Sequence, residues 1–600
     1  MTKFKLGLCM PGAVTSGAYT AGAVDYILRT LEKWNVESKE DNKTLPEMYV
    51  ELAASGGTSA GGMSTIMMML QLLGKENLLY DSWVNLDDDK KSETFDKALD
   101  TLDITSSKRI PSILNSTFID NITERAFQFP NGIEESAIKL PDYISKDFSL
   151  ILSHTLLNGV PLSLNLGTEY TSYRRVSDDR KKTKNSTLES LDYVTYEHSY
   201  FSFFNLSKEA SFSKDNKTSP YIWFNPFSKD IVEKIKVTTQ ATGAFPIGLS
   251  PRMFKNEVFP KDLILASVKK SIISRYLNVK VGNKSLLKEN ETDWDDVFKH
   301  VNENFESLTV DGGAMNNAPI GQLISELRNK KSIEYDPTFG LIQIDPYPNR
   351  YNKDLNEYEP KRNLFPFAKD LIKTLWGGNK TKRDEVANQN IGDFVIGEIF
   401  PTQRVRGKEN IPDAKVLATS SMSAFGGVLS KEFREHDYQL GMENARNFLR
   451  YKFFFPVNQI DESDSSGLNF DNLRAIWNRY PEAKSKFIRF HKVIRNGKEE
   501  KIEVLPIIPD IDILTDDNTY FSQLARPKVS RDILNKRKKK IKKRIRAVID
   551  NVNLSIKSDD TSVKSKRFMR GVIKILYVNR IYKMINEEVI SDLKKRDLLD

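Results

Sequence analysis

The sequence predicts an α/β protein with a mostly parallel sheet covered by helices on both faces. Two successive segments, residues 4–34 and 49–73, each show a strand pattern, a glycine-rich turn and an apolar helix pattern. A third strand-like segment, residues 307–311, ends in an acid and two glycines. Repeated strand–turn–helix units are typical of parallel sheets. The composition, 39% apolar and 28% charged residues over 600 positions, supplies a sizeable core and excludes a fully disordered chain.

The first unit begins with a buried strand over Phe4–Met10, where apolar residues alternate until Pro11 and Gly12 end the pattern. A helix then runs to about Trp34, with one apolar face formed by Ala21, Val24, Ile27, Leu28 and Leu31. Its first turns are nearly all glycine and alanine. We expect these small residues to let the helix lie close against the sheet.

The second unit holds the strongest chemical signal, Gly57-Thr58-Ser59-Ala60-Gly61, between the apolar run Tyr49–Ala54 and a helix that reaches Leu73. This is the pattern of a nucleophile elbow, in which Gly57 and Gly61 permit a sharp turn that exposes the Ser59 hydroxyl. The N-terminus of the following helix favours negative charge beside that hydroxyl. The alternative is a Gly/Ser-rich turn without chemistry.

Two further segments carry candidate residues. Pro11–Gly17 is a small-residue loop whose backbone N–H groups at Gly12, Ala13 and Val14 have little steric cover, and it lacks the lysine of a P-loop. Asp311 ends a strand and precedes Gly312 and Gly313, a position suited to a catalytic base; the alternative is a simple turn. Beside a nucleophile elbow, the loop becomes a candidate oxyanion hole.

Together these motifs resemble the patatin-like phospholipase family, in particular a long bacterial branch of it. The resemblance spans residues 4 to about 455. It rests on Gly12–Tyr19 as the oxyanion loop, Gly57–Gly61 as the serine motif, Asp311–Gly313 as the aspartate motif, Ala241–Pro246, and more loosely Asp345–Pro348 and Phe433–Gly441. One departure concerns the loop, which has Pro11-Gly12-Ala13-Val14 where many patatins have Asp-Gly-Gly-Gly. Backbone donors survive that change, because an N–H does not depend on its side chain.

The resemblance implies a three-layer patatin-like fold and a lipid acyl hydrolase of the phospholipase A or lysophospholipase type. Ser59 would be the nucleophile and Asp311 its base, in a dyad that works through an acyl-enzyme and needs no metal or organic cofactor. Phe245 and Pro246 are candidates for an acyl pocket. An acyltransferase that uses the same dyad is the alternative. A triad with His436 is a second alternative, because Ser59, Asp311 and His436 follow the chain order of α/β-hydrolases.

Three regions are expected along the chain. Residues 1–350 form the catalytic core, with insertions at about 86–150 and 168–234; residues 351–455 form a helical extension packed on it; residues 456–600 form a C-terminal region that ends in a basic helical tail. The charge runs Asp87–Lys91 and Asp178–Lys182 are expected to be solvated surface rather than metal sites.

The net charge of +9 is concentrated at the C-terminus. Residues from Pro527 to Asp600 include 22 Lys or Arg and 9 Asp or Glu, whereas the first 526 residues have a net charge of −4. In Lys536–Val552 a helix would align Ile541, Ile545, Val548 and Val552 between basic flanks, which predicts docking of Lys536–Arg546 on an anionic membrane. The alternative is that this stripe packs on the protein itself. A weaker alternative for the whole protein is a non-enzymatic nucleic-acid or membrane binder that acts through this tail. No nucleic-acid fold signature accompanies the charge, so a nucleic-acid partner is not expected.

The remaining features bear on compartment. Cys9 is the single cysteine, which excludes an internal disulfide framework and a zinc site of several thiolates. No apolar run is long enough to cross a bilayer, and no secretory signal is recognisable. The expected location is the cytoplasm, with peripheral attachment at the inner membrane surface. The sequence leaves the oligomeric state, lipid headgroup and sn-position open.

Overall fold

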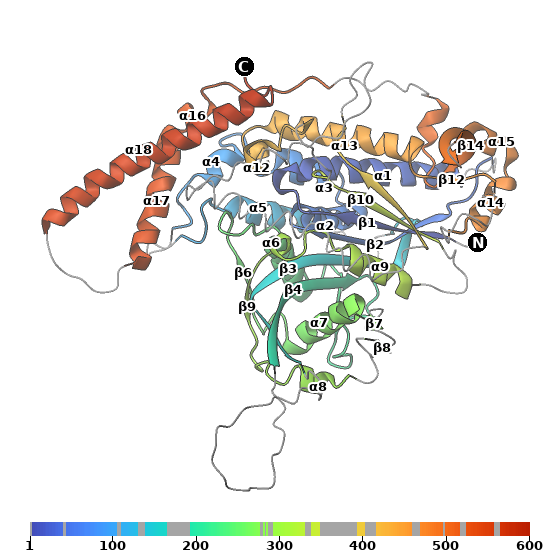
Figure 1. Cartoon of the computed structure of the whole chain (residues 1–600), viewed down its shortest axis with the longest axis horizontal. Helices are drawn as coiled ribbons and strands as arrows, with labels where there is room; N and C mark the ends of the chain where they lie inside the picture. Colours follow the sequence, from blue (N-terminus) through green and yellow to red (C-terminus); the bar gives the residue numbers. More distant parts are fainter. Residues whose placement is uncertain are drawn as a thin grey trace, which may run out of the picture.

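A computed structural model of the chain describes residues 3–39, 44–104, 110–129, 139–164, 193–276, 280–281, 284–285, 292–330, 338–348, 393–402, 416–458, 468–495, 498–515, 524–556 and 564–600. It is a mixed α/β structure with a mostly parallel central sheet flanked by helices (Figure 1). The predicted fold class is confirmed at that level.

The central sheet has nine strands, of which the main path runs in the order β11-β10-β1-β2-β3-β4-β5. Strands β11, β10, β1, β2 and β3 are parallel to one another. Strands β4 and β9 each pair with β3 in the antiparallel direction. Strand β5 is parallel to β4, and β6 is antiparallel to β9. The bounds are β1 Phe4–Met10, β2 Val50–Thr58, β3 Ile144–Leu164, β4 Tyr193–Asn205, β5 Tyr221–Trp223, β6 Arg252–Phe254, β9 Ser307–Asp311, β10 Phe339–Ile344 and β11 Phe394–Ile399.

Strand β1 shows how the sheet separates two cores. Phe4, Leu6, Leu8 and Met10 belong to the larger core, which includes the apolar residues of helices α1 (Gly17–Glu37) and α2 (Ala60–Leu72). Cys9, on the opposite face of the strand, belongs to a smaller core with Leu323 and Leu327 of α9 (Ile320–Asn329). Because side chains alternate along a strand, the period-two pattern sorts the residues to their layers.

The small residues of α1 face a helix rather than the sheet. A Cβ atom on Gly22 would lie 1.9 Å from the carbonyl oxygen of Tyr438, and one on Gly441 would lie 2.1 Å from that of Tyr19. Helices α1 and α13 (Lys431–Tyr451) therefore cross with their backbones in contact. The sequence prediction that α1 uses its small residues against the sheet is wrong for Gly22, because the partner lies more than four hundred residues away in the chain.

The other helices of the body are short or cover the sheet edges. Their bounds are α3 Leu78–Tyr80, α4 Thr94–Ala98, α5 Thr117–Ala126, α6 Lys229–Thr242, α7 Lys261–Tyr276, α8 Trp294–Val297 and α12 Ser421–Ala424. A short hairpin is formed by β7 (Lys280–Val281) and β8 (Lys284–Ser285).

A second, antiparallel sheet follows α13. It has the order β12-β14-β13, with β12 Phe454–Pro456, β13 Arg489–Arg495 and β14 Lys498–Pro506, and it comes with α14 (Asp471–Asn478) and α15 (Pro481–Phe487). Trp477 and Phe487 pack on Trp34 of α1, with ring centroids 6.0 and 5.6 Å away. This aromatic cluster joins the C-terminal region to the core.

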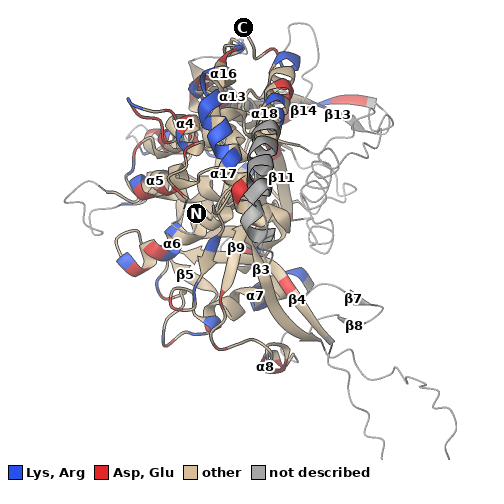
Figure 2. Cartoon of the chain, turned by 90° about the vertical axis from the view of Figure 1, so that its left-hand side faces the viewer, with Lys and Arg blue, Asp and Glu red and all other residues tan. Residues whose placement is uncertain are grey.

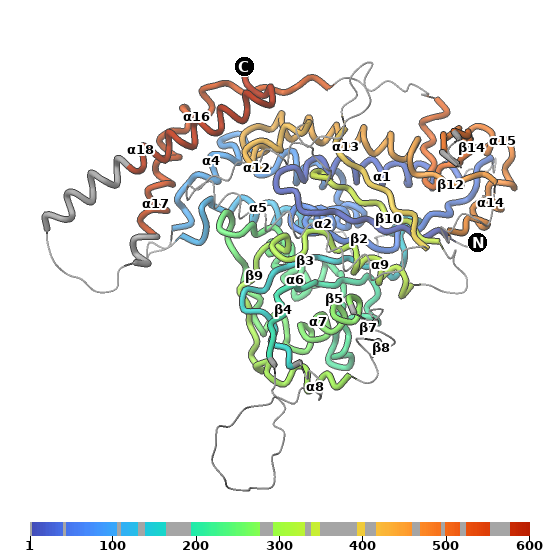
Figure 3. The backbone as a smooth tube through the Cα atoms, viewed as in Figure 1, coloured from blue at the N-terminus to red at the C-terminus, as the bar shows by residue number. Residues whose placement is uncertain are grey.

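The basic tail forms α16 (Ile533–Lys536), α17 (Lys538–Ile556) and α18 (Lys564–Lys595), which project from one end of the body (Figure 3). Ile541 is buried and Ile545 packs against the same core, so this part of the predicted apolar stripe contacts the protein itself. Val548 is half-buried, and the side chain of Val552 lies outside the described part of the chain. For Ile541 and Ile545, the structure therefore agrees with the alternative that the stripe packs on the protein itself.

The second expected region is not separate from the first, because the two share the central sheet. Residues 351–455, expected to be a helical extension, contribute strand β11 to the central sheet as well as α12 and α13, and residues 351–392 lie outside the described part. The expected insertions likewise contain sheet strands, the start of β3 and all of β4 and β5. Within the described residues, no helix is long and apolar enough to span a membrane.

Candidate active site

Ser59 sits on the sharp turn between β2 and α2. Its φ of 55° and ψ of −126° are strained for a residue with a side chain, and Ala60 begins the helix directly after it. A Cβ on Gly57 would lie 2.4 Å from the carbonyl carbon of Gly61, and one on Gly61 would lie 1.8 Å from the carbonyl oxygen of Met10. Both glycines are needed for close backbone approach, which is the geometry expected of a nucleophile elbow.

Thr242, the last residue of α6, fixes this turn from outside. Its Oγ1 accepts a hydrogen bond from the Ser59 N–H (2.9 Å) and donates one to the Ser153 carbonyl of β3 (2.8 Å). The residue lies in the Ala241–Pro246 segment, but the sequence did not indicate this role. Thr242 is a positioning residue, because it holds the backbone of Ser59 rather than its hydroxyl.

Asp311 ends β9 and is 1% exposed. Its Oδ1 accepts a hydrogen bond from the Gly313 N–H (2.7 Å), its own N–H donates to the Ala244 carbonyl (3.0 Å), and its carbonyl accepts from Thr155 Oγ1 (3.0 Å). The last two bonds tie the backbone of Asp311 to the loop after α6 and to β3. The end of β9, which the sequence indicated as the position of the acid, is therefore held by hydrogen bonds to neighbouring elements.

Ser59 and Asp311 come together although 252 positions separate them. Burial raises the pKa of the Asp311 carboxyl to about 7, and hydrogen bonding from the Ser59 hydroxyl and the Gly313 N–H lowers it only in part. The Ser59 hydroxyl is thus near the carboxyl. Oδ2 of Asp311 is nevertheless buried without a fully formed hydrogen bond to any described residue. Loose contacts of this kind between nucleophile and base are common before substrate binds.

The loop after β1 lies against Ser59. A Cβ on Gly12 would lie 3.0 Å from the Cβ of Ser59 and 2.3 Å from Oδ1 of Asn317. The Gly12 N–H already donates to the Asn317 carbonyl (3.2 Å). Ala13 and Val14 begin a 3₁₀ turn over Val14–Ser16, where the first N–H groups have no partner within the turn, and Val14 has a φ of 49°. Of the three expected donors, Ala13 and Val14 are therefore the ones left for an oxyanion.

This loop is braced by residues 417–428, a segment in which no sequence motif pointed to the site. Thr15 Oγ1 donates to the Ala424 carbonyl (2.6 Å) and accepts from the Gly427 N–H (3.0 Å). Ser16 Oγ lies 2.8 Å from Thr419 Oγ1. The buried Asp437 carboxylate accepts from the Thr419 N–H (2.9 Å). The chain thus holds its candidate oxyanion loop through contacts about four hundred residues apart.

An apolar pocket opens beside Ser59, with a cavity volume of about 60 Å³. Helix α2, the segment 82–86, α5, and the loops around 245 and 425 line it, through Val14, Thr15, Ser59, Ala60, Met63, Met67, Ser82, Trp83, Leu86, Leu114, Phe118, Ile119, Ile122, Gly243, Phe245, Leu249, Phe425 and Val428. Phe245 lies edge-on to Phe425, with ring centroids 5.3 Å apart. The prediction of Phe245 as a pocket residue agrees with this lining. Pro246 is not among the lining residues, because the chain turns outward at Ile247, which is exposed.

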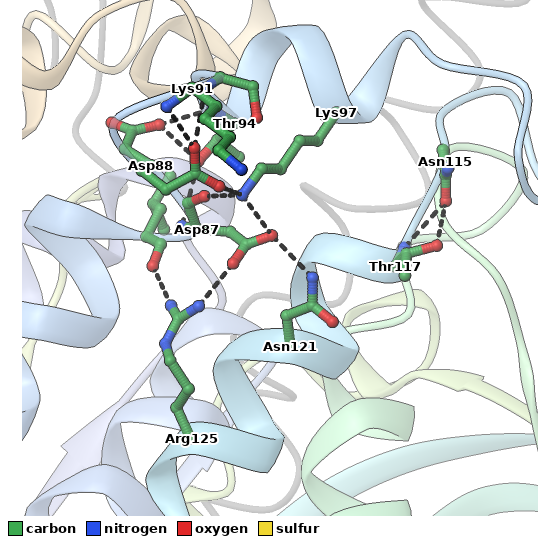
Figure 4. Close-up of polar contacts among 12 residues, drawn as sticks. Asp87, Asp88, Lys91, Thr94, Lys97, Asn115, Thr117, Asn121 and Arg125 are labelled. Carbon is green, nitrogen blue, oxygen red and sulfur yellow. Dashed lines mark hydrogen bonds and ion pairs between the residues drawn. The ribbon is translucent and has the colours of Figure 1, made fainter.

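The outer wall of the pocket rests on a charged cluster (Figure 4). The buried Asp87 carboxylate binds Arg125 Nη1 (2.5 Å), Asn121 Nδ2 (2.9 Å) and Lys97 Nζ (3.2 Å). Its neighbour Asp88 pairs with the buried guanidinium of Arg434. The expectation that Asp87–Lys91 is solvated surface is wrong for these two acids, because they join α4, α5 and α13. The run Asp178–Lys182 lies outside the described residues.

Two histidines bear on the triad alternative. His436 is on α13, and its Nδ1 lies 2.7 Å from Oδ1 of Asp437. His154 is the cross-strand partner of Asp311, in a cluster with Tyr200 and Phe254, and burial lowers its pKa to about 3. His154 is therefore neutral at physiological pH. In the described ranges no three His, Cys, Asp or Glu residues are grouped as metal ligands.

No family model matches the chain. The chain is similar to the uncharacterized protein y4iI of Sinorhizobium fredii (strain NBRC 101917 / NGR234), with 24% identity over 490 residues, covering 74% of this chain and 64% of that protein. The chain therefore spans less than two thirds of that relative's length, and the relative's name states no activity.

Proposed function

We propose that the protein is a lipid acyl hydrolase with a patatin-like fold, which cleaves carboxylic esters through Ser59 and Asp311. The observation that carries this proposal is the pairing of a strained, elbow-bound serine with a buried carboxyl whose pKa is raised to about 7. A carboxyl with that pKa is a useful general base near neutral pH. The adjoining apolar pocket supports an acyl chain as the group to be bound.

The first half-reaction forms an acyl-enzyme. Ser59 Oγ attacks the ester carbonyl carbon while Oδ2 of Asp311 takes the hydroxyl proton. The N–H groups of Ala13 and Val14 donate to the tetrahedral oxyanion, and the N-terminus of α2 adds favourable potential. When the intermediate collapses, the carbon–oxygen bond to the alcohol breaks, and Asp311 gives its proton to the leaving oxygen.

The second half-reaction restores the enzyme. Asp311 takes a proton from a water molecule, whose oxygen attacks the acyl carbonyl carbon through a second tetrahedral intermediate. Collapse breaks the bond to Ser59 Oγ, which recovers its proton from Asp311, and the fatty acid leaves. A transferase would replace this water by an acceptor alcohol, with the same proton movements.

A fluorophosphonate probe together with a soluble short-chain ester tests the proposal. We expect the wild-type protein to be labelled and to hydrolyse the ester, and Ser59→Ala to lose both properties while keeping its thermal unfolding transition. Ser64→Ala, on the same helix, is the matched control, because the Ser64 hydroxyl only donates to the Ala60 carbonyl within α2. Labelling that persists in Ser59→Ala, or a wild-type protein that neither reacts nor hydrolyses esters, would contradict the proposal.

A further inference from the structure

We propose that the surface formed by the pocket rim and the outer face of α17 docks on an anionic lipid bilayer. This inference rests on the proposed function, because it names the surface from which a lipid substrate enters. It differs from the sequence-based expectation in its apolar part. The docking side chains belong to two loops at the pocket, and the apolar stripe of α17 serves to attach the helix to the body.

The rim of the pocket presents large apolar side chains to solvent. Ile247 is 70% exposed and Ile113 is 46% exposed, and the Ile113 N–H donates to the Ile247 carbonyl (2.9 Å). Each lies beside a pocket residue, since Leu114 follows Ile113 and Phe245 is two residues from Ile247. Single exposed apolar residues are ordinary, but a pair joined at the mouth of an apolar pocket indicates an interaction surface.

The backbone at Ile247 supports this reading. Its φ of 68° is an outlier for a β-branched residue. This left-handed conformation has a steric cost that isoleucine would not have in extended backbone. The conformation is maintained by the paired loop, because the N–H groups of Ile113 and Leu114 donate to the carbonyls of Ile247 and Gly248. Strain that holds an isoleucine outward is typical of a functional position.

The same loop anchors α17. The buried guanidinium of Arg544 donates to the carbonyls of Ile113 (2.7 Å), Ser112 (2.8 Å) and Asp100 (2.9 Å), and it pairs with the Asp103 carboxylate. Leu102, between the last two contacts, is 87% exposed. Together with the hydrogen bond from the Ile110 N–H to Asn551 Oδ1 (3.3 Å), these contacts of Arg544 fix the basic helix to the apolar rim.

The outer face of α17 carries charge without an internal partner. Lys539, Lys543 and Arg546 are exposed, and they follow one another at spacings of four and three, which puts them on one side of the helix. Ile541 and Arg544 occupy the opposite side, toward the body. Within the described residues these three side chains have no ion pair, and Figure 2 shows the Lys and Arg positions of α17, in blue, near α4 and α5.

A bilayer with anionic headgroups can bind both the basic and the apolar side chains of this surface. Basic side chains bind the headgroups, and neighbouring apolar side chains enter the acyl boundary. A nucleic acid would neutralise the charge, but it offers no apolar contact to Ile113 and Ile247 beside the pocket, or to the exposed Leu102. Binding to vesicles should therefore require both the charges and the apolar rim.

The experiment is co-sedimentation of the Ser59→Ala protein with vesicles of phosphatidylcholine and phosphatidylglycerol, or of phosphatidylcholine alone. The active-site substitution keeps the vesicles intact. We expect binding to the anionic vesicles that falls as salt is raised, and little binding to the neutral ones. Adding Lys539→Gln, Lys543→Gln and Arg546→Gln should weaken anionic binding about 10-fold or more. Ile113→Gln with Ile247→Asn should weaken it comparably; asparagine tolerates the positive φ, so the fold is spared.

Matched controls lie on the second sheet and on the two helices that accompany it, at the other end of the molecule (Figure 1). Arg479→Gln, Lys486→Gln and Lys501→Gln remove three exposed charges, and Phe490→Gln removes an apolar side chain that is 70% exposed. These variants should bind as the parent does. Equal binding by the α17 and control variants would overturn the proposal, as would preferential binding to DNA or to a second copy of the chain.

The docking surface and the proposed chemistry can fail independently. With Ser59 restored, the α17 and rim variants should hydrolyse a soluble short-chain ester at the wild-type rate. Normal vesicle binding by a protein that hydrolyses no ester would refute the proposed function alone. Normal hydrolysis with no vesicle binding would refute the docking surface alone.

Discussion

Asp311→Asn should inactivate the protein and also stabilise it above neutral pH. Burial raises the pKa of this carboxyl from its ordinary value of 3.8 to about 7, so the folded state binds the proton more tightly than the unfolded state. For a group with a raised pKa, the stabilising contribution is complete below the unfolded value and is lost as pH rises through the folded value. Asparagine keeps the shape, and its amide oxygen still accepts from the Gly313 N–H.

The size of the effect follows from the two pKa values. Between pH 5 and pH 8 the wild-type protein should lose about 2–3 kcal/mol of unfolding free energy relative to Asp311→Asn. For a chain of 600 residues this corresponds to about 2 °C in Tm, because the unfolding entropy scales with chain length. Other titrating groups are common to both proteins and cancel in the difference.

The assay is thermal unfolding of both proteins at pH 5, 6, 7 and 8, with ester hydrolysis measured in parallel. We expect the difference in Tm to grow in favour of Asp311→Asn as pH rises, and to level off above pH 7. The kcat/KM of the wild-type protein should rise through an apparent pKa near 7, because the base must be deprotonated. Parallel Tm curves, or an Asp311→Asn protein with near wild-type turnover, would refute the reasoning.

Three further changes test other parts of the site. Thr242→Val removes the acceptor of the Ser59 N–H and should lower kcat about 10-fold or more with little change in KM, whereas Thr242→Ser should restore it; equal rates in both would contradict a positioning role. His436→Gln should keep most activity if it folds, because His436 pairs with Asp437; a folded variant as inactive as Ser59→Ala would favour the triad. Leu114→Trp should fill the pocket, so that long-chain esters lose activity while acetyl esters keep it, as measured by kcat/KM across chain lengths.

Local sequence patterns determined the elements and the strand ends. The alternation in Phe4–Met10 gave the first strand with its bounds, because a strand between two helical layers buries both faces. Glycines at 57 and 61 marked the serine turn, because no larger residue fits the close backbone contacts there. The acid at 311 was recognisable because it ends an apolar strand pattern and precedes two glycines. These signals are short-range, so one sequence is enough to detect them.

The tertiary structure alone decided which distant residues meet. The brace of the oxyanion loop by Thr419 and the Gly22–Gly441 crossing join positions about four hundred residues apart, and no local period encodes such pairings. The same holds for charge. Asp87 is indistinguishable in sequence from a solvated acid, and becomes a buried anchor because Arg125 and Lys97 are brought to it. Arg544 likewise points toward the body rather than to the exposed basic face of α17, because the Asp103 carboxylate and three backbone carbonyls bind its guanidinium. A buried charge needs such partners, and only the folded chain brings them together.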